Sequence, residues 1–349
     1  MDLKGKKILV TGGAGFIGSN LVDGLIAAGN KVTVLDDFST GKRENLQEAG
    51  SKVNIVDGSI LNYDLAKDLI RQNDVVYHLA VQCLRVCFDK PHLVHEVNAT
   101  GTLNLLQAAQ ELKDNEKHAI ERFVYVSSSE VYGTAKTAPM KEDHELSPTT
   151  VYGASKLAGE LYTKAYFTTY GMPAMVLRPF NTYGFREHHE GASGEVIPRF
   201  VVRILNGKSP IIFGDGTQTR DFTFVTDTVK GLMVAGSHDG FLGQEVNIAC
   251  GKEVTIKYIA DYLLKAFSAE HLGIQWEADR PGDVHRHFAD VTKLNSTTGF
   301  KAGIQIEEGM GRYIDWFKAK YPNPAKLLEE CQTHNWKLSN AEVLTTASR

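Results

Sequence analysis

Tyr152 and Lys156 have the types and spacing that acid–base chemistry requires. They lie four residues apart in the run YGASK, and residues i and i+4 of a helix share one face, so both side chains can meet one ligand. A free tyrosine has a pKa of about 10 and is a poor base at neutral pH, whereas a nearby cation favours the phenolate. The pair can therefore take a proton from an alcohol. Because the same spacing is common in surface helices, the interpretation depends on the rest of the chain.

Gly12, Gly15 and Gly18 form a second chemical pattern in the run TGGAGFIG. They follow the β-type run Lys7–Thr11 and open the helical pattern of Gly15–Ala28, which is the strand–turn–helix context of a dinucleotide-binding motif. The first glycine permits a tight turn, the second lets the backbone approach a pyrophosphate, and the third lets the helix pack closely on the strand. The free N–H groups at the start of the helix then bind the phosphates.

Asp36 ends the next expected strand and bears on the choice of dinucleotide. A carboxylate there accepts hydrogen bonds from both ribose hydroxyls of NAD and repels the 2′-phosphate of NADP. Lys42 and Arg43 follow a short loop later and can tolerate that phosphate. The sequence favours NAD and makes NADP the less favoured alternative.

A bound nicotinamide would allow the tyrosine to take part in the oxidation of an alcohol. Tyr152 takes the proton of a hydroxyl while hydride leaves the same carbon, and Lys156 can hydrogen-bond the nicotinamide ribose. Ser127–Ser129 close another expected strand and precede Glu130. Ligands of a doubly wound sheet bind at the carboxyl ends of strands, so a serine there can bridge the substrate oxygen and the tyrosine. One of the three serines is expected to cap the strand end instead.

The elements that position these residues are short apolar runs that alternate with helical patterns. Near-continuous apolar strands separated by helices predict an α/β fold with a Rossmann-like, doubly wound parallel sheet. The expected strands are Lys7–Thr11, Lys31–Asp36, Lys52–Asp57, Asp74–Ala80, Arg122–Ser127 and Ala174–Leu177, and the long helices are Gly15–Ala28, Val94–Leu112 and Val151–Tyr170.

After Arg178, glycine-rich loops separate shorter elements. This change predicts a smaller C-terminal α/β substrate lobe over the carboxyl edge of the sheet, with helices over Ile197–Asn206, Asp227–Ala235, Ile256–Phe267 and Glu307–Ala319. We expect a dinucleotide-binding domain over residues 1–180, a substrate lobe over residues 181–320 with some exchange of chain between them, and a polar tail without a core pattern over residues 321–349.

Composition excludes several classes of protein. The chain is 42% hydrophobic and 23% charged, which is ordinary for a folded protein, and no apolar run approaches the ~18 residues of a membrane span. A net charge of −4 without a long basic block argues against nucleic acid as a partner. The apolar run at the N-terminus is too short for a signal peptide. Four cysteines make neither a disulfide framework nor a zinc pattern, so we expect no metal and a reduced, cytoplasmic location.

The chain resembles the extended short-chain dehydrogenase/reductase family, and within it the NAD-dependent nucleotide-sugar epimerases, dehydratases and decarboxylases, of which the UDP-glucose 4-epimerases are the nearest type. The resemblance covers about residues 6–315 and is more specific for the family than for the reaction. It is carried by the motifs TGGAGFIG, DDFSTGKREN, HLA, VNATGTLN, SSSEVYG, YGASK, RPFNTYG, VIPRF, FGDGTQTRDF and RPGD.

The resemblance implies roles for individual residues. Catalytic roles fall on Tyr152, Lys156, Ser128 and Glu130. In the substrate lobe, Asn181 would hold the sugar diphosphate, Arg220 and Arg280 would bind it, Val196 and Phe213 would border the base, Asp283 would contact its ribose, and Ser128 and Ser129 would lie at the sugar. Cofactor binding falls on Gly12, Gly15, Phe16, Ile17, Gly18, Asp36, Asp37, Ser39, Ser59, Ile60, Leu79, Ala80, Asn98, Ser127, Tyr152 and Lys156.

Some positions depart from the family's pattern. Ser59 stands where the family usually has an adenine-contacting aspartate, and Phe185 stands in place of a proline. The run VQCLRVCFDKP replaces a loop rich in alanine and serine, and the resemblance places its Cys83, Arg85 and Cys87 beside the nicotinamide. Cys83 either packs or touches substrate. The pair His188–His189 has no third metal ligand at a suitable spacing, so a loop or substrate-edge contact is expected.

The resemblance implies a shared first step, oxidation at C4 of the sugar, and then three branches. Return of hydride to the other face gives the C4 epimer, loss of the C5 proton and the C6 hydroxyl gives a 4,6- or 5,6-dehydratase, and a C6 carboxylate is lost in a decarboxylase. Ordinary dehydratases of the family carry Thr-Asp-Glu at residues 128–130, whereas this chain has a serine in place of the acid. The Thr-Ser-Glu of UDP-glucuronate decarboxylases is nearer, and glutamate also occurs in epimerases.

We therefore favour a UDP-hexose 4-epimerase acting on UDP-glucose, UDP-N-acetylglucosamine or UDP-glucuronate. Dehydratase and UDP-glucuronate decarboxylase activities remain the alternatives. A non-enzymatic NAD-binding regulator would be expected to lack Tyr152 or Lys156. Family members usually pair the helices that correspond to Val94–Leu112 and Val151–Tyr170 across a two-fold axis, so a homodimer is expected. Core packing explains the apolar residues available for it equally well: Leu103, Leu106, Leu161 and Tyr162.

Overall fold

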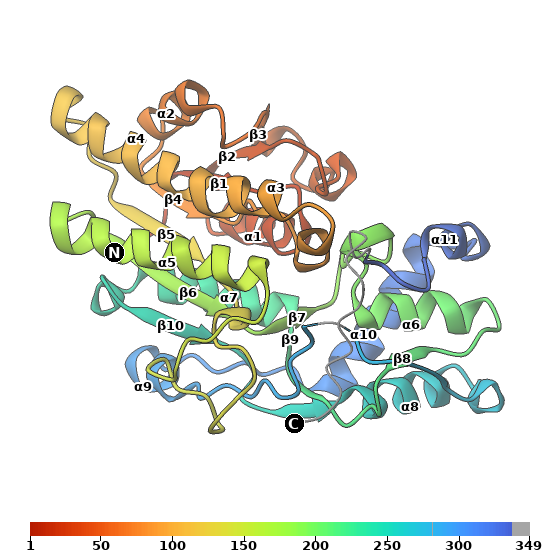
Figure 1. Cartoon of the computed structure of the whole chain (residues 1–349). Coiled ribbons are helices and arrows are strands. Elements are labelled where there is room, and N and C mark those ends of the chain that lie inside the picture. Colours follow the sequence, from red (N-terminus) through yellow and green to blue (C-terminus); the bar gives the residue numbers. More distant parts are fainter. Residues whose placement is uncertain (281, 337–349) are drawn as a thin grey trace.

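The computed structural model describes residues 1–280 and 282–336 (Figure 1). The predicted tail, residues 321–349, therefore lies outside the described residues from residue 337 onward, and so does Pro281 of the RPGD motif. Among the described residues, no helix is both long and apolar enough to cross a membrane.

A seven-stranded parallel sheet forms the centre of the molecule, and it confirms the predicted Rossmann-like fold (Figure 1). The strand order is β10-β6-β5-β4-β1-β2-β3, so the order reverses beside β1, where ligands bind in this class of sheet. The strands are β1 (Lys7–Thr11), β2 (Lys31–Asp36), β3 (Val53–Asp57), β4 (Val75–His78), β5 (Arg122–Val126), β6 (Ala174–Pro179) and β10 (Glu245–Ile248).

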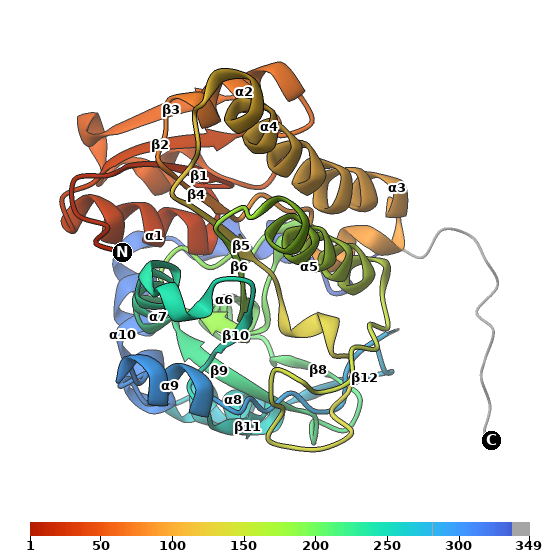
Figure 2. The same ribbon diagram turned by 90° about the vertical axis from the view of Figure 1, so that its left-hand side faces the viewer.

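Alternation along each strand explains why helices cover both faces of the sheet. In β1, Ile8 and Val10 belong to one buried apolar cluster and Leu9 belongs to another. The first cluster includes α1 (Phe16–Ala27) and α7 (Val225–Ser237), and the second includes α2 (Tyr63–Arg71) and α4 (Gly101–Glu116). The two layers lie on opposite sides of the sheet in Figure 2. Strands buried on both faces produce the continuous apolar runs seen in the sequence.

The predicted helix Val94–Leu112 is one continuous segment with an irregular middle. It consists of α3 (Pro91–His95), a π-helical turn (Glu96–Thr100) and α4, and it ends where Lys117 adopts a left-handed conformation. A π turn inserts an extra residue into the helical repeat, so the apolar spacing alone could not place the start of the segment.

Helix α5 (Val151–Tyr170), which carries YGASK, has the predicted bounds. Thr150 caps it, because its side chain accepts a hydrogen bond from the N–H of Gly153 at 3.1 Å. Farther along, Glu160 of α5 and Arg178 of β6 form a buried ion pair, with Nε and Nη2 at 2.9 and 2.7 Å from the two carboxylate oxygens. Paired, hydrogen-bonded charges are tolerated in a core, and this pair fixes α5 against the sheet.

A second lobe has its own core of aromatic and aliphatic side chains. Strand β10 returns from this part of the chain to the main sheet. The lobe is built from two small sheets, β11-β9-β7 and β12-β8, and from further helices. These elements are β7 (Asn181–Tyr183), α6 (Val196–Leu205), β8 (Ile211–Phe213), β9 (Thr219–Phe224), β11 (Glu253–Thr255), α8 (Ile256–Ala266), β12 (Gln275–Glu277), α10 (Ile306–Lys320) and α11 (Ala325–Glu330). Helix α9 (Thr292–Thr298) packs on the main sheet instead, because its Leu294 belongs to the cluster that includes Ile8 and Val10.

The expectation that the tail lacks a core pattern is wrong for its described part. Leu327 of α11 and Cys331 after it are buried in the core of the second lobe. Two apolar residues four positions apart in a polar stretch are too short a pattern to signal a helix in the sequence.

Candidate functional site

One cavity lies where the order of the main sheet reverses, at the carboxyl ends of β1, β2 and β4. Its walls include nine of the residues predicted to bind a dinucleotide: Gly12, Gly15, Asp36, Asp37, Ser39, Ser59, Ile60, Leu79 and Ala80. Gln82, Thr40 and Val81 also line it and were not predicted.

The turn after β1 shows why glycine is required there. Gly12 has φ of +70°, and a Cβ on it would lie 2.7 Å from the backbone N of Ala80 at the end of β4. A Cβ on Gly18 would lie 2.1 Å from the carbonyl oxygen of Gly12. Side chains at these positions would separate the turn, the helix and the next strand. The backbone therefore forms a close cradle at the start of α1 that fits a pyrophosphate.

Asp36 closes this cavity at the end of β2. Its Oδ2 accepts a hydrogen bond from the N–H of Ala14 at 2.8 Å, and its Oδ1 accepts one from the N–H of Phe38 at 2.9 Å. Burial raises the pKa of the Asp36 carboxyl, and these backbone donors oppose the shift. Each oxygen keeps acceptor capacity for a further donor such as a ribose hydroxyl.

The two cations that follow Asp36 are both paired with acids. Lys42 Nζ lies 2.7 Å from Glu190, and Arg43 Nη2 lies 2.5 Å from Asp57 with its guanidinium over the ring of Phe38. A 2′-phosphate would have to compete with these carboxylates for both cations.

A second cavity lies between the main sheet and the second lobe, and its walls include every residue predicted to bind substrate. These residues are Ser128, Ser129, Asn181, Val196, Phe213, Arg220, Arg280 and Asp283, and the predicted catalytic residues Glu130 and Tyr152 line it too. Residues from the turn after β5 and from α5, β7, α6, β8 and β9 thus converge on one space.

At one end of this cavity, Tyr152 lies with Ser128 and Glu130. Ser128 Oγ accepts a hydrogen bond from the N–H of Glu130 at 3.2 Å, so the serine that caps the strand end also faces the cavity. Burial raises the pKa of the Tyr152 phenol above its ordinary value, and the hydrogen bond with Ser128 opposes this rise. The net direction is opposite to the lowering of the pKa that the sequence analysis expected from Lys156. Burial also raises the pKa of the Glu130 carboxyl.

Lys156 does not line either cavity. Its Nζ donates to the carbonyl oxygen of Val126 at 2.6 Å and lies over the ring of Tyr125, and its side chain is 3% exposed. Burial lowers the pKa of the Lys156 ammonium to about 7, while the charge of Glu160 opposes this shift. A lysine so poised can exchange its proton near neutral pH.

Ser129 is held by a histidine that the sequence analysis did not identify. Its Oγ lies 3.3 Å from Nδ1 of His287, whose Nε2 lies 3.0 Å from the carbonyl oxygen of Gly133. Burial lowers the pKa of His287 to about 3, so the ring is neutral, donates from Nε2 and accepts from the serine hydroxyl. Residue 287 follows the RPGD motif by a few positions, and no local spacing links it to Ser129.

Two arginines converge on one acid deeper in the cavity. Arg220 Nη2 and Arg280 Nη2 lie 2.7 and 2.6 Å from the same oxygen of Asp283. Burial alone would raise the pKa of the Asp283 carboxyl, but the two guanidinium groups hold it below its ordinary value. Nearby, the buried Oδ1 of Asn181 and Nε of Arg280 have no hydrogen-bond partner among the described residues. The two guanidinium groups, including the Nε–H of Arg280, suit a doubly charged anion, whereas the Asn181 oxygen is an acceptor and suits a hydroxyl donor.

Comparison with known proteins identifies the family. Residues 9–313 match the model of the GDP-mannose 4,6-dehydratase family. A UDP-glucose 4-epimerase of Mycolicibacterium smegmatis is 34% identical over 319 residues, which is 90% of this chain and 99% of the relative. The chain belongs to the extended short-chain dehydrogenase/reductase family.

Other members of the family catalyse different reactions. A dTDP-glucose 4,6-dehydratase of Actinoplanes is 35% identical and covers 90% of this chain and 98% of the relative. Among solved structures, an epimerase of Methanothermobacter thermautotrophicus has a TM-score of 0.86 at 33% identity and covers 93% of this chain and 95% of that one. A UDP-glucuronic acid 4-epimerase of Bacillus cereus, solved with UDP-glucuronic acid and NAD, has a TM-score of 0.82 at 31% identity and covers 90% and 100%. The relatives are enzymes, and they do not agree on one reaction.

Some of the residues predicted to bind the cofactor do not line either cavity. Asn98 is buried and bonds through Oδ1 to the N–H of Gln82 at 2.8 Å and through Nδ2 to Ser155 Oγ at 3.0 Å, so it holds the loop after β4 against α5. Ser127 Oγ is buried without a partner among the described residues. Phe16, Ile17 and Gly18 belong to the first turns of α1 and do not line the cavity.

Helix α6 supplies cavity residues that the sequence analysis missed. Arg199 and Arg203 line the second cavity together with the predicted Val196. These three lie at positions i, i+3 and i+7 of one helix, which is the spacing of a single face. That spacing, combined with the family position of Val196, was the signal available in the sequence.

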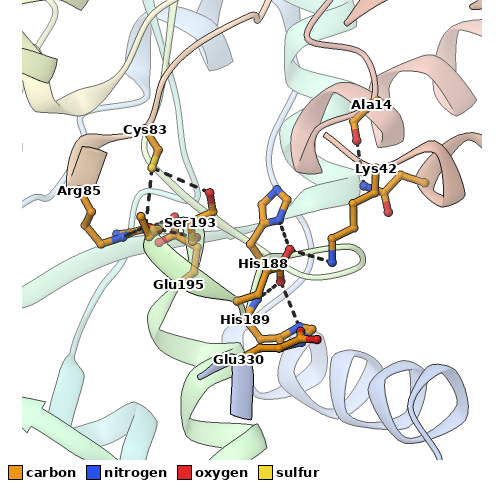
Figure 3. A network of polar contacts seen from close by, with 12 residues as sticks. Ala14, Lys42, Cys83, Arg85, His188, His189, Ser193, Glu195 and Glu330 are labelled. Atoms are coloured by element: carbon orange, nitrogen blue, oxygen red, sulfur yellow. Dashed lines mark hydrogen bonds and ion pairs between the residues drawn. The ribbon is translucent and has the colours of Figure 1, made fainter. Parts of the chain in front are cut away.

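The loop between β7 and α6 is held from two sides, as Figure 3 shows. Arg85 Nη2 donates to the Ser193 carbonyl at 3.0 Å and to Glu195 at 2.8 Å, and Cys83 Sγ lies 3.6 Å from the Ala192 carbonyl oxygen. Cys83 and Arg85 also line the second cavity. Cys83 therefore both packs against the loop and faces this cavity.

On the other side of the same loop, His188 and His189 both contact the carboxylate of Glu190, at 2.9 and 3.3 Å, and Lys42 reaches it as well (Figure 3). This is the loop contact expected for the two histidines. No group of three or more His, Cys, Asp or Glu side chains suited to a metal ion occurs within residues 1–280 and 282–336.

The lowered pKa of Lys156 predicts a specific pH dependence of stability. The unfolded chain keeps this proton up to about pH 10.5, whereas the folded protein releases it near pH 7, so unfolding takes up a proton between these values. Relative to Lys156→Met, the wild type should therefore gain free energy of unfolding as the pH rises from 7 to 10. Urea titrations of both proteins at several pH values measure this, and a constant difference would contradict the burial argument.

Proposed function

We propose that the protein is an NAD-dependent nucleotide-sugar 4-epimerase whose substrate is a UDP-hexose. The observation that carries the proposal is a single cavity that holds Tyr152, Ser128 and Glu130 together with the arginine pair Arg220 and Arg280. A cavity that holds both an alcohol-oxidising group and a diphosphate-binding group fits a sugar nucleotide better than it fits a free sugar or a free nucleoside diphosphate.

The cofactor cavity supports NAD. The cradle formed by Gly12 and Gly18 fits a pyrophosphate, and Asp36 has acceptor capacity for the ribose hydroxyls. Lys42 and Arg43 are engaged by carboxylates, which disfavours the phosphate of NADP. A dTDP-glucose 4,6-dehydratase of Streptomyces venezuelae, 29% identical, was also solved with NAD.

The chemistry follows from the positions of the side chains. Bound NAD supplies the acceptor and donor of hydride. Tyr152 accepts the proton of the C4 hydroxyl as the C4–H bond breaks, and Ser128 hydrogen-bonds the same oxygen. With NAD bound, Lys156 would hydrogen-bond the nicotinamide ribose, and its positive charge would favour the phenolate of Tyr152. Once the 4-ketone has rotated in the cavity, its other face would receive the hydride while Tyr152 returns the proton to the oxygen, which gives the C4 epimer.

The neighbourhood of Ser129 favours epimerisation over dehydration. Loss of the C6 hydroxyl needs a proton donor there, and a serine hydroxyl bonded to a neutral histidine is a weak acid. Glu130 is nearby and its raised pKa suits proton transfer at C5, so the dehydratase remains the second candidate. The Ser-Ser-Glu sequence and a UDP-glucuronic acid decarboxylase of Danio rerio, 32% identical, support UDP-glucuronate decarboxylation as a third candidate.

We further propose a homodimer formed through α4 and α5. Leu161 on α5 is 56% exposed and is available for such contact, whereas Leu106 on α4 is fully buried in the core. A monomer at micromolar concentration in sedimentation would contradict this arrangement.

NMR in D₂O tests the reaction. Purified protein with NAD is incubated separately with UDP-glucose, UDP-N-acetylglucosamine and UDP-glucuronate. An epimerase interconverts the C4 epimers of at least one sugar and leaves C5 unlabelled, because only C4–H breaks. Deuterium at C5 with loss of the C6 oxygen would establish the dehydratase, and release of CO₂ from UDP-glucuronate would establish the decarboxylase.

Tyr152→Phe tests the assigned base. The variant should lose at least about 10²-fold in kcat, because general-base catalysis is removed, while it still binds NAD. Tyr162→Phe, on the same helix but away from the cavity, is the control. Turnover close to that of the wild type in Tyr152→Phe would remove the tyrosine from the mechanism.

Asp36→Ala tests the choice of cofactor. Removal of the carboxylate takes away the ribose acceptors and the repulsion of a 2′-phosphate, so the ratio of NAD to NADP affinity should shift toward NADP by about tenfold, or about 1.4 kcal/mol. Calorimetric titration of both dinucleotides measures the ratio, with Asp64→Ala on α2 as the control. An equal loss of both affinities would show that Asp36 only supports the turn.

A further inference from the structure

The chain continues past the family domain into a segment that contacts residues in the wall of the cavity that Tyr152 and Arg220 line. The family match ends at residue 313, and α11 follows it beside α6 (Figure 1). We call residues 331–336, which come directly after α11, the C-terminal strap. The first residue of the strap, Cys331, and Leu327 of α11 are buried in the core of the second lobe, so the strap starts from a fixed point.

The strap holds Arg199 by its backbone. Nη2 of this arginine donates to the carbonyl oxygens of Gln332 and Thr333, both at 2.7 Å. Arg199 lines the substrate cavity from α6. A guanidinium bound to two successive carbonyls has a fixed direction, so the strap determines where this positive charge lies in the cavity wall.

The strap also holds the loop that precedes α6. Asn335 is 3% exposed, and its Nδ2 donates to the carbonyl oxygen of Gly194 at 2.8 Å. Gly194 lines the same cavity. A buried amide hydrogen bond of this kind fixes the backbone of the loop, because breaking it would leave a buried polar group unpaired.

Two aromatic rings of the strap pack on Phe213. The centroid of the Phe213 ring lies 4.8 Å from that of Trp336 and 5.6 Å from that of His334, with interplanar angles of 73° and 51°. Phe213 lines the cavity, and neither strap ring is among the residues that line it. By their packing, the two strap rings set the plane of the ring that the family resemblance places at the nucleobase.

We propose that the C-terminal strap is a positioning element for the nucleotide half of the substrate. It acts through Gly194, Arg199 and Phe213, and its ligand is a pyrimidine nucleoside diphosphate, so the inference rests on the proposed nucleotide-sugar substrate. None of the polar or aromatic contacts of the described strap residues goes to Tyr152, Lys156 or Ser128. The strap therefore governs the binding of the nucleotide and leaves the reaction at C4 unaffected.

Trp336→Ala in the full-length chain tests the inference. UDP affinity, measured by calorimetry with NAD present, should fall between about twofold and about tenfold, which is the range of one aromatic pair. KM for the sugar nucleotide should rise by the same factor, while kcat and NAD affinity stay at the wild-type value. Trp336→Phe should restore UDP binding, and Asn335→Ala should weaken it in the same way. Trp276→Ala, which removes an exposed indole on β12, is the control.

The outcomes separate the inference from the proposed function. Unchanged UDP affinity in both Trp336→Ala and Asn335→Ala would overturn the strap's role, and so would a loss of kcat with KM unchanged. Failure of Trp336→Phe to restore binding would overturn the role of the aromatic packing. A wild-type protein that binds neither UDP nor dTDP would overturn the proposed function, and the strap inference with it.

Discussion

The close approach of two backbones, the turn after β1 and the end of β4, is the constraint on which the rest of the site depends. Gly12 faces Ala80 with no space for a side chain between them, and its φ of +70° suits glycine alone. This contact holds two strand ends together at the point where the sheet order reverses. The start of α1, the carboxylate of Asp36 and the end of β4 consequently line one cavity.

The substrate cavity depends on the same edge of the sheet. The serines directly follow β5, and α5 is fixed against β6 by the buried pair Glu160–Arg178, so Tyr152 and Ser128 face a common space. The second lobe then adds the charged half of the site, in which one oxygen of Asp283 holds Arg220 and Arg280 close together. Asp283 compensates one of the two positive charges, so the pair can still bind a further anion, and a diphosphate is suited to that role.

Local patterns in the sequence predicted the main sheet well. The first two strands have the predicted bounds because buried parallel strands are continuous apolar runs between clear breaks. The glycine turn and the YGASK helix were also placed correctly, since their chemistry follows from spacing within one element. The substrate residues needed the family resemblance, because lone arginines such as Arg220 carry no local signal.

Contacts between distant parts of the chain were not predictable in this way. The bond between Ser129 and His287 joins residues 158 positions apart in the sequence. The strap contacts Phe213 although the two are also far apart in the sequence. The burial of Lys156 against Val126 is also a tertiary effect, and it lowers the lysine pKa where the sequence suggested a cation beside Tyr152. Spacing shows which side chains can meet, whereas burial determines their charge.

In the proposed reaction, hydride moves from C4 of a sugar and returns to C4 within one active site. Turnover of UDP-glucose deuterated at C4, followed by mass spectrometry and NMR of the product, tests this transfer most directly. We expect the deuterium to stay on C4 of the epimer, without exchange into water, and turnover to show a primary isotope effect. Loss of the label to solvent would contradict it, because that result requires removal of the C4 hydrogen as a proton.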